Sequence, residues 1–213
     1  MSEERMKAII IGDYSSATYH PLSKVEEAFK DILSQKVDLA FTEDREAFKY
    51  EELSKYSLCI VYVDAWDRKL SSDCISGLLS YTLNGGGLLV IHNGISYQGN
   101  TEFAQLIGAK FINHPPYQNL SYKVLKENHP ILEGIRDFEM EEELYNFEFD
   151  NFSDHEILLE CTNGELTMPA AWIKSFGKGE VIYLSPGHDG KTFEKEPFRK
   201  LISNSVFYFV NKK

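Results

Sequence analysis

The chain has little cysteine, and its three cysteines are far apart. Cys59, Cys74 and Cys161 form no CxxC pair and do not fall among clustered metal-ligating residues. Closely spaced cysteines mark structural zinc sites and disulfide frameworks, so this spacing excludes both as organising features. We expect three free, mostly buried thiols in a reducing compartment.

Long hydrophobic runs and positive charge are also scarce. The sequence contains no apolar run long enough to span a bilayer, so we expect no membrane partner. Lys and Arg total 22 against 33 Asp and Glu, which gives a net charge of −11. Binding of a phosphate backbone needs clustered Lys and Arg, so nucleic acid is not an expected partner. The acidic first residues do not resemble a signal peptide, and we expect a cytoplasmic protein.

A phosphate-binding glycine loop is missing as well, although three glycines stand together at 85–87. Phosphate-binding glycines follow a strand and open a helix, whereas these precede the apolar run 88–91. That run predicts a strand buried on both faces, and it stops at His92, Asn93 and Gly94. Ligands of open α/β sheets bind beyond the carboxyl ends of strands, so His92 is the first candidate functional residue.

The first half of the chain alternates strand-like and helix-like segments. Apolar runs predict buried strands at 7–12, 37–41 and 58–63, before the glycine-led strand. Helical spacing of apolar residues predicts helices at 21–33, 45–55 and 71–83. Strands that alternate with helices form parallel sheets with right-handed crossovers.

The second half has strand-like segments with little room for crossover helices. A helix is predicted at 101–106 and another at 197–210. The strand-like segments between them lie at 111–116, 121–125, 143–149, 156–159, 170–173 and 181–185. Short connections favour antiparallel or mixed pairing here. Because no repeat or linker interrupts the sequence, we expect one domain over residues 1–213.

Four histidines follow predicted strands. His20 lies in the loop after the first strand, His92 ends the glycine-led strand, His114 follows a short extended segment, and His188 follows the last strand. Carboxyl ends of parallel strands meet at one edge of a sheet, so these rings are expected to converge. His129 and His155 are expected to be structural.

An acidic run at 137–143 precedes the segment that contains Tyr145. Glu141, Glu142 and Glu143 are expected to open a strand that continues to Tyr145. Because a strand alternates its faces, Glu141 and Glu143 share one side, Glu142 takes the other, and only one carboxylate needs to point inward. We interpret the rest of the run as a solvated edge.

Histidine and glutamate together support two kinds of chemistry. Neutral imidazoles and a carboxylate bind Zn²⁺ or a related divalent ion, which activates a bound water. The same groups also act directly as acid and base near neutral pH. Three aromatic residues also have two possible roles. Trp66, Trp172 and Tyr145 either line a sugar site or pack in the core.

Five stretches, in the same order along the chain, resemble the motifs of the ThuA-like (trehalose utilisation) family. They are GGGLLVIH at 85–92, FAQLIGAKFINHP at 103–115, NHPILEGI at 128–135, EELY at 142–145, and the set PAAW, GKGEVIY and PGHD between 169 and 189. The EELY stretch departs from the family's DE.Y motif by having Glu in place of Asp. The first loop matches the family only loosely.

This resemblance implies a class I glutamine amidotransferase-like fold. That fold is a flavodoxin-like three-layer α/β sandwich with a mostly parallel central sheet, and here we expect extra antiparallel strands in the second half. In amidotransferases a cysteine nucleophile stands at the tight turn after a central strand, and a histidine follows a late strand. Here His92 occupies the cysteine position and His188 resembles the late histidine. A thiolate must lie beside its base, so we expect no glutaminase activity.

The resemblance also implies a role in carbohydrate utilisation. We predict a hydrolase-like enzyme that acts on a sugar or disaccharide derivative, with His92, His188 and Glu143 as catalytic groups. The expected substrate-binding residues are His20, His114, Trp66, Tyr145 and Asn93. The expected metal ligands, if a divalent ion such as Zn²⁺ is the cofactor, are His92, His114, Glu143 and His188. A non-catalytic sugar-binding or assembly module remains the alternative, and homo-oligomers are compatible with either.

Overall fold

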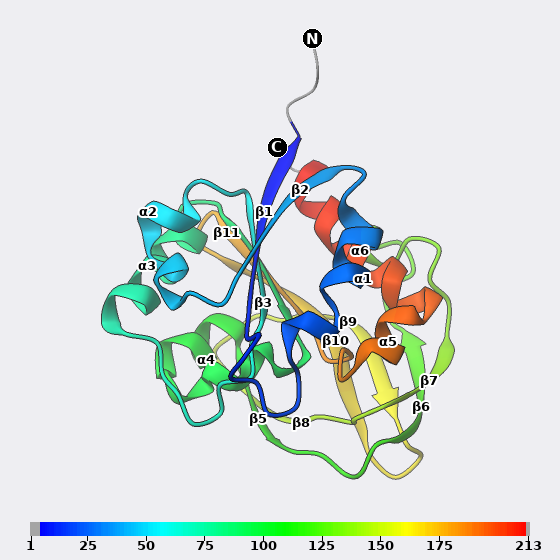
Figure 1. The fold of residues 1–213 in the computed structure, drawn as a ribbon. Coiled ribbons are helices and arrows are strands. Elements are labelled where there is room, and N and C mark those ends of the chain that lie inside the picture. The colour runs from blue at the N-terminus through cyan, green and yellow to red at the C-terminus, as the bar shows by residue number, and fades with distance from the viewer. Residues whose placement is uncertain (1–4, 212–213) are drawn as a thin grey trace.

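A nine-stranded mixed sheet forms the centre of the protein in a computed structural model that describes residues 5–211 (Figure 1). The strand order is β2-β1-β3-β4-β11-β10-β9-β6-β7. The parallel strands are β1 (Met6–Gly12), β2 (Val37–Thr42), β3 (Leu58–Tyr62), β4 (Gly87–Ile91) and β11 (Gly179–Leu184). The antiparallel strands are β10 (Thr167–Phe176), β9 (Glu156–Thr162), β6 (Gln118–Val124) and β7 (Phe138–Glu142). The α/β class and the antiparallel second half are confirmed.

Helices cover both faces of the parallel half. On one face lie α1 (Glu26–Leu33), which follows the 3-10 turn η1 (Leu22–Lys24), together with η4 (Pro130–Leu132), α5 (Gly190–Glu194) and α6 (Glu196–Asn211). On the other lie η2 (Arg45–Phe48), α2 (Tyr50–Leu53), α3 (Ser72–Leu83), η3 (His92–Gly99) and α4 (Thr101–Ile107). A separate antiparallel pair, β5 (Ala109–Asn113) and β8 (Asn146–Phe149), packs against this second face.

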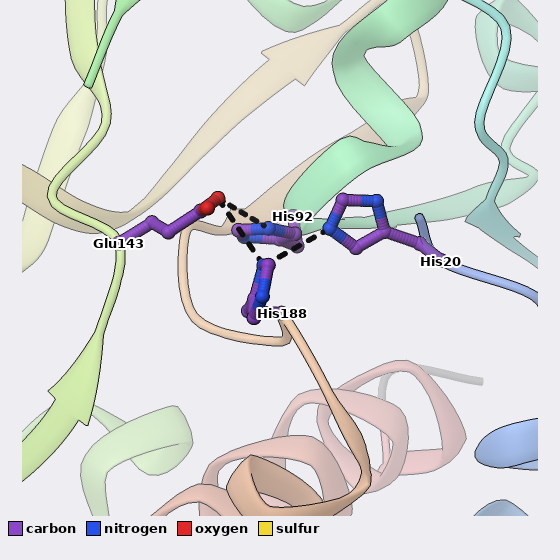
Figure 2. A group of neighbouring side chains, drawn as sticks. All are labelled: His20, His92, Glu143 and His188. Carbon is purple, nitrogen blue, oxygen red and sulfur yellow. Dashed lines mark hydrogen bonds and ion pairs between the residues drawn. The ribbon is translucent and has the colours of Figure 1, made fainter. Parts of the chain in front are cut away.

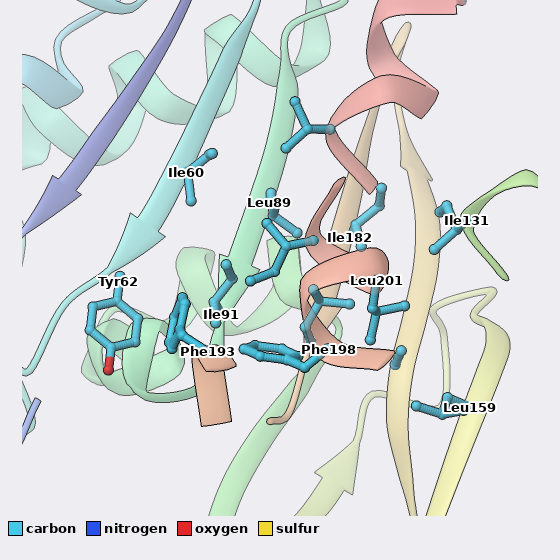
Figure 3. Close-up of a cluster of buried hydrophobic side chains, with 14 of the residues drawn as sticks. Ile60, Tyr62, Leu89, Ile91, Ile131, Leu159, Ile182, Phe193, Phe198 and Leu201 are labelled. Carbon is cyan, nitrogen blue, oxygen red and sulfur yellow. The ribbon is translucent and has the colours of Figure 1, made fainter. Parts of the chain in front are cut away.

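Strand alternation divides the core into two clusters, one on each side of the sheet. In β4, Leu89 and Ile91 face the side of α1 and α6, whereas Leu88 and Val90 face the side of α3 and α4. Figure 3 shows the first cluster, in which Phe198 of α6 lies against the sheet. Each fully buried side chain of this size contributes about 1.5–3 kcal/mol through the hydrophobic effect.

The segment 45–55 is not the single helix that its pattern predicts. Lys49 is extended and separates η2 from α2. The backbone at this break packs closely on α3, because a Cβ atom at Gly77 would lie 2.5 Å from the Phe48 carbonyl oxygen. A short helix that was not predicted, α5, follows the last strand and is capped by Asp189, whose carboxylate accepts from two backbone amides.

The predicted strand from Glu141 through Tyr145 is wrong. β7 ends at Glu142, and residues 143–145 cross from the large sheet to β8 of the small one. The expected alternation of faces therefore breaks at Glu143. Glu141 is exposed, but Glu142 and Glu143 are both buried, so two carboxylates of the acidic run point inward instead of one.

The three cysteines are free and buried, as expected. Trp172 lies entirely within the core, where its ring stacks on Tyr183 and its Nε1–H donates to the Ile107 carbonyl. Among the helices that the structure describes, none is long and apolar enough to cross a bilayer.

Candidate functional site

Four side chains from four separate segments meet beyond the carboxyl ends of the parallel strands (Figure 2). They are His20 after β1, His92 after β4, Glu143 after β7 and His188 after β11. One nitrogen or oxygen atom of each lies within 4.8 Å of those of the other three. We call this group the histidine–glutamate cluster. Parallel strand ends bring the three histidines to one edge, as the topology predicts.

Glu143 and His188 lie at the centre of the contacts in the cluster. Glu143 Oε2 lies 3.4 Å from His92 Nε2 and 3.3 Å from His188 Nδ1. His188 Nδ1 also lies 3.1 Å from His20 Nε2. Although burial opposes ionisation, the neighbouring His188 and His92 rings hold the pKa of Glu143 well below its usual range. The hydrogen bond to Glu143 in turn raises the pKa of His188.

His92 stands at a sharp turn between β4 and η3. Its φ of 48° is in the left-handed region, which a non-glycine residue rarely adopts. The turn packs tightly, since a Cβ at Gly94 would lie 2.3 Å from the Val61 carbonyl oxygen. His92 Nδ1 lies 2.7 Å from the Ser185 carbonyl oxygen, which can only accept, so Nδ1 carries the proton in the neutral ring. Its Nε2 lone pair then faces the cluster.

His20 is held by Asp64, which follows β3. The Asp64 carboxylate accepts from the backbone amides of Tyr19, at 2.8 Å, and of His20, at 3.4 Å. The same oxygen lies 3.9 Å from His20 Nδ1. Burial opposes ionisation of Asp64, but hydrogen bonds from His20 and Tyr19 lower its pKa to about 2. Burial of the His20 ring lowers the pKa of His20 and favours its neutral form.

Glu142 holds the loop that carries His188. One carboxylate oxygen of this fully buried residue accepts from the Gly187 amide at 2.9 Å, the His188 amide at 3.2 Å and the Thr192 hydroxyl at 2.9 Å. The other oxygen accepts from the Glu143 amide at 2.9 Å. The Glu142 carboxylate therefore accepts four hydrogen bonds from the protein itself and has a structural role. The acidic run was the sequence signal for this role. The predicted alternation of faces required only one inward carboxylate in the run and placed the others at a solvated edge.

His114 lies beside the cluster and outside the group of four. Its Nε2 is 3.7 Å from Glu143 Oε1, the oxygen turned away from His92 and His188, and its side chain is 35% exposed. His20 takes the place that the predicted metal-ligand set assigned to His114. The difference arises because β5 pairs with β8 in the small sheet, so His114 does not follow a strand of the parallel edge.

A row of aromatic rings leads from the cluster to the surface. The Tyr145 ring stacks on His92 at 4.3 Å and its hydroxyl lies 3.0 Å from His92 Nε2. Phe111 packs against Tyr145 at 4.4 Å and against Trp66 at 4.9 Å. Trp66 is 40% exposed. The predicted substrate-binding residues Tyr145 and Trp66 are thus linked through Phe111, which sequence reasoning missed.

Trp66 forms part of a pocket of about 350 Å³ next to His20. The other residues that line it are Ser16, Thr18, Tyr19, Asp64, Asp67 and Arg68. Tyr19 and Asp64 connect the pocket to the cluster, since both contact His20. An indole ring and several hydroxyl, carboxylate and guanidinium groups together are the types of side chain that bind a sugar ring.

Three other predicted residues have distinct places. Asn93 is fully buried beside His92, and neither atom of its side-chain amide has a hydrogen-bond partner. His129 accepts from the Ile131 amide and caps η4. His155 packs against Phe149. The two latter histidines are outside the cluster, in agreement with their expected structural roles.

The cysteines are poorly suited to act as nucleophiles. Burial raises the pKa of Cys161 to about 12 and also raises the pKa of Cys59. Reactive cysteines have lowered pKa values, because the thiolate is the nucleophile. Cys74 lies in α3, where its thiol contacts the Arg45 carbonyl.

Solved structures share this fold at low sequence identity. A ThuA-like protein from Bacteroides uniformis has a TM-score of 0.83 and 21% identity, over 100% of this chain and 94% of that one. A ThuA-like protein from Parabacteroides merdae has a TM-score of 0.82 and 17% identity, over 99% and 91%. A β-galactosidase from Bacillus circulans has a TM-score of 0.63 and 16% identity, over 96% of this chain but 31% of its own.

No curated protein matches the chain significantly. The sequence profile of ThuA, a family described as trehalose utilisation, matches residues 8–209. That match covers nearly the whole chain and agrees with the motifs found along the sequence. The chain therefore belongs to the ThuA family and, with it, to the proteins of carbohydrate utilisation.

Proposed function

We propose that this protein is an enzyme that hydrolyses a sugar or disaccharide derivative at the histidine–glutamate cluster. The observation that carries the proposal is the convergence of His20, His92, Glu143 and His188 from four separate segments. Burial of three imidazoles and a carboxylate in one place costs folding free energy. Such clusters of ionisable groups are typical of functional sites. Family membership supports the carbohydrate substrate.

Two familiar hydrolytic mechanisms do not fit this site. A cysteine nucleophile is disfavoured, because His92 stands at the turn after β4 and the thiol pKa values of Cys59 and Cys161 are raised. A glycosidase with two free carboxylates is also disfavoured, because Glu142 already accepts four hydrogen bonds within the protein. Glu143 is then the carboxylate available in the cluster, and water must be activated by the cluster as a unit.

The pocket beside His20 is the proposed binding place for the sugar. Trp66 offers an exposed indole face, and Arg68 and Asp67 offer polar groups at the same pocket. A sugar ring stacked on Trp66 would lie beside Tyr19 and Asp64, which both contact His20 of the cluster. The proposed partner is thus a small-molecule sugar or glycoside.

The test is turnover of a panel of trehalose, other disaccharides and their oxidised derivatives, with products followed by chromatography. The variants are His92→Asn and His188→Asn, and the matched control is His129→Asn. Asn is an effective N-cap, so the control preserves the cap of η4 while it removes a histidine elsewhere. Loss of turnover in both cluster variants alone would support the proposal. Unchanged rates in both would overturn it.

A non-catalytic sugar-binding or assembly module is the second candidate. It is favoured by the histidine at the position where amidotransferases have their cysteine, and by the likeness to part of a larger β-galactosidase. This candidate predicts that a sugar raises the melting temperature while no sugar in the panel yields a product.

A further inference from the structure

We propose that the histidine–glutamate cluster binds one divalent transition-metal ion, for which Zn²⁺ is the best fit. The proposed ligand atoms are His20 Nε2, His92 Nε2, His188 Nδ1 and Glu143 Oε2. This inference deepens the proposed function and rests on it for the role of the ion in turnover. Binding of the ion itself is measurable without any substrate.

The spacing of the four atoms matches that of ligands around zinc. Zinc lies about 2.0–2.2 Å from nitrogen and oxygen ligands, so neighbouring ligands of a tetrahedral ion are about 3.3 Å apart. The three contacts in the cluster measure 3.1, 3.3 and 3.4 Å. All remaining separations are below 4.8 Å, which leaves room for a fifth ligand such as water.

The types of ligand narrow the choice of ion. Imidazole nitrogens suit zinc and its neighbours in the first transition row, whereas Mg²⁺ and Ca²⁺ prefer sites made of oxygen alone. Cys59, Cys74 and Cys161 are not part of the cluster, so the soft thiolate ligands that favour Cu⁺ are missing from it. A single carboxylate with three neutral imidazoles matches a dication and leaves one positive charge to polarise a ligand.

The positions of the imidazole protons leave more acceptors than donors in the cluster, which favours a cation at its centre. The neutral His92 ring has its proton on Nδ1, so Nε2 is an acceptor: the Tyr145 hydroxyl lies 3.0 Å from it, and the Glu143 carboxylate, a second acceptor, lies 3.4 Å from it. His188 Nδ1 has at most one proton for both Glu143 Oε2 and His20 Nε2. Two acceptors that face each other repel, and a cation between them turns this repulsion into attraction.

Residues around the cluster orient the rings as they do at metal sites. Metal-bound histidines usually donate their other N–H to a carbonyl or a carboxylate. His92 donates to the Ser185 carbonyl in this way. His20 Nδ1 is buried without a hydrogen-bond partner, and the nearest carboxylate, Asp64, lies 3.9 Å away. With Nε2 bound to the ion, Nδ1 carries the proton and is directed toward Asp64.

Access to the ion is expected from the side of His188 and His114, whose side chains are 28% and 35% exposed. The Tyr145 hydroxyl lies 3.0 Å from His92 Nε2 and can donate to a fifth ligand. Substrate or water would therefore meet the ion beside Tyr145.

The first experiment is elemental analysis of protein purified without a histidine tag. We expect close to one equivalent of a transition metal, with zinc the main element. After removal of the metal with a chelator, titration with Zn²⁺ and with Co²⁺ is expected to show one site per chain. Bound Co²⁺ should give the visible absorption of a four- or five-coordinate ion. Absence of both bound metal and titratable binding would overturn the proposal.

Variants connect the binding to the four ligand atoms. His20→Asn, His92→Asn and Glu143→Gln are each expected to weaken Zn²⁺ binding by more than about 100-fold, because second-shell changes alone cost 10–100-fold. His129→Asn is expected to bind as the wild type does, because His129 caps η4 outside the cluster. Circular dichroism of each variant identifies any that do not fold, and His188→Asn provides a further ligand variant. Wild-type affinity in all the folded ligand variants would overturn the assignment.

The outcomes separate this inference from the proposed function. Metal binding without turnover of any sugar derivative would leave the metal site standing and remove the hydrolytic function. Turnover by metal-free protein that is unchanged by a chelator would leave the function standing and remove the ion from the reaction, and absence of titratable binding would remove the metal site itself.

Discussion

The parallel and antiparallel parts of the sheet contribute to the cluster in different ways. The parallel part supplies three histidines, each from a loop after a strand, so their convergence follows from topology. The antiparallel part supplies Glu143 from a segment that leaves one sheet to join another. There one hydrogen bond, from the Glu143 amide to the Glu142 carboxylate, helps to hold the position. The histidines are therefore placed by the backbone, and the carboxylate is placed by its neighbours.

The largest expected effect tests the parallel part. We expect His92→Asn to lower kcat/KM for the sugar derivative by about 10³-fold or more, since it removes a central group of the cluster. Asn tolerates the left-handed backbone at this position, where φ is 48°, so the change addresses chemistry more than strain. Steady-state kinetics measure the effect, and His129→Asn is the control. A loss below tenfold would show that the cluster is not the reaction centre.

The next effect tests the antiparallel part. Glu142→Gln is expected to lower the free energy of unfolding by about 3 kcal/mol, because buried amides lose a charged acceptor. Urea denaturation measures the change, and the exposed neighbour Glu141→Gln, expected within about 0.5 kcal/mol of wild type, is the control. Equal stabilities for the two variants would contradict the role given to Glu142.

A smaller effect is expected at the pocket beside His20. Trp66→Ala should raise KM about tenfold with little change in kcat, because an aromatic contact of about 1.4 kcal/mol is lost from binding alone. Trp66→Phe should recover part of the affinity. A fall in kcat with unchanged KM would place Trp66 in a different role.

The smallest effect distinguishes His114 from His20. His114→Asn is expected to change kcat/KM by about threefold at most, since its partly exposed contact with Glu143 is worth little. His20→Asn should cost far more, because its Nε2 lies within the cluster. Parallel kinetic measurements on the two variants give the comparison, and a larger loss at His114 would reverse the assignment.

Sequence patterns alone determined much of this protein. Apolar runs with helices between them determined the parallel sheet, and polar residues at strand ends pointed to His20, His92 and His188. The free, buried cysteines also agree with expectation, whereas the choice between core and sugar site for Trp172 stayed open until the structure placed it in the core. These features depend on local periodicity and on a general rule for parallel sheets, so they are visible without coordinates.

The tertiary structure decided where β7 ends, and with it the roles of Glu142 and Glu143. The acidic run has the same local pattern whether the strand continues or stops. Its end is determined by pairing with β6 in one sheet and by the pairing of β8 with β5 in the other. The choice of His20 over His114 has the same cause. Such pairings are made between distant segments, so only the folded chain decides them.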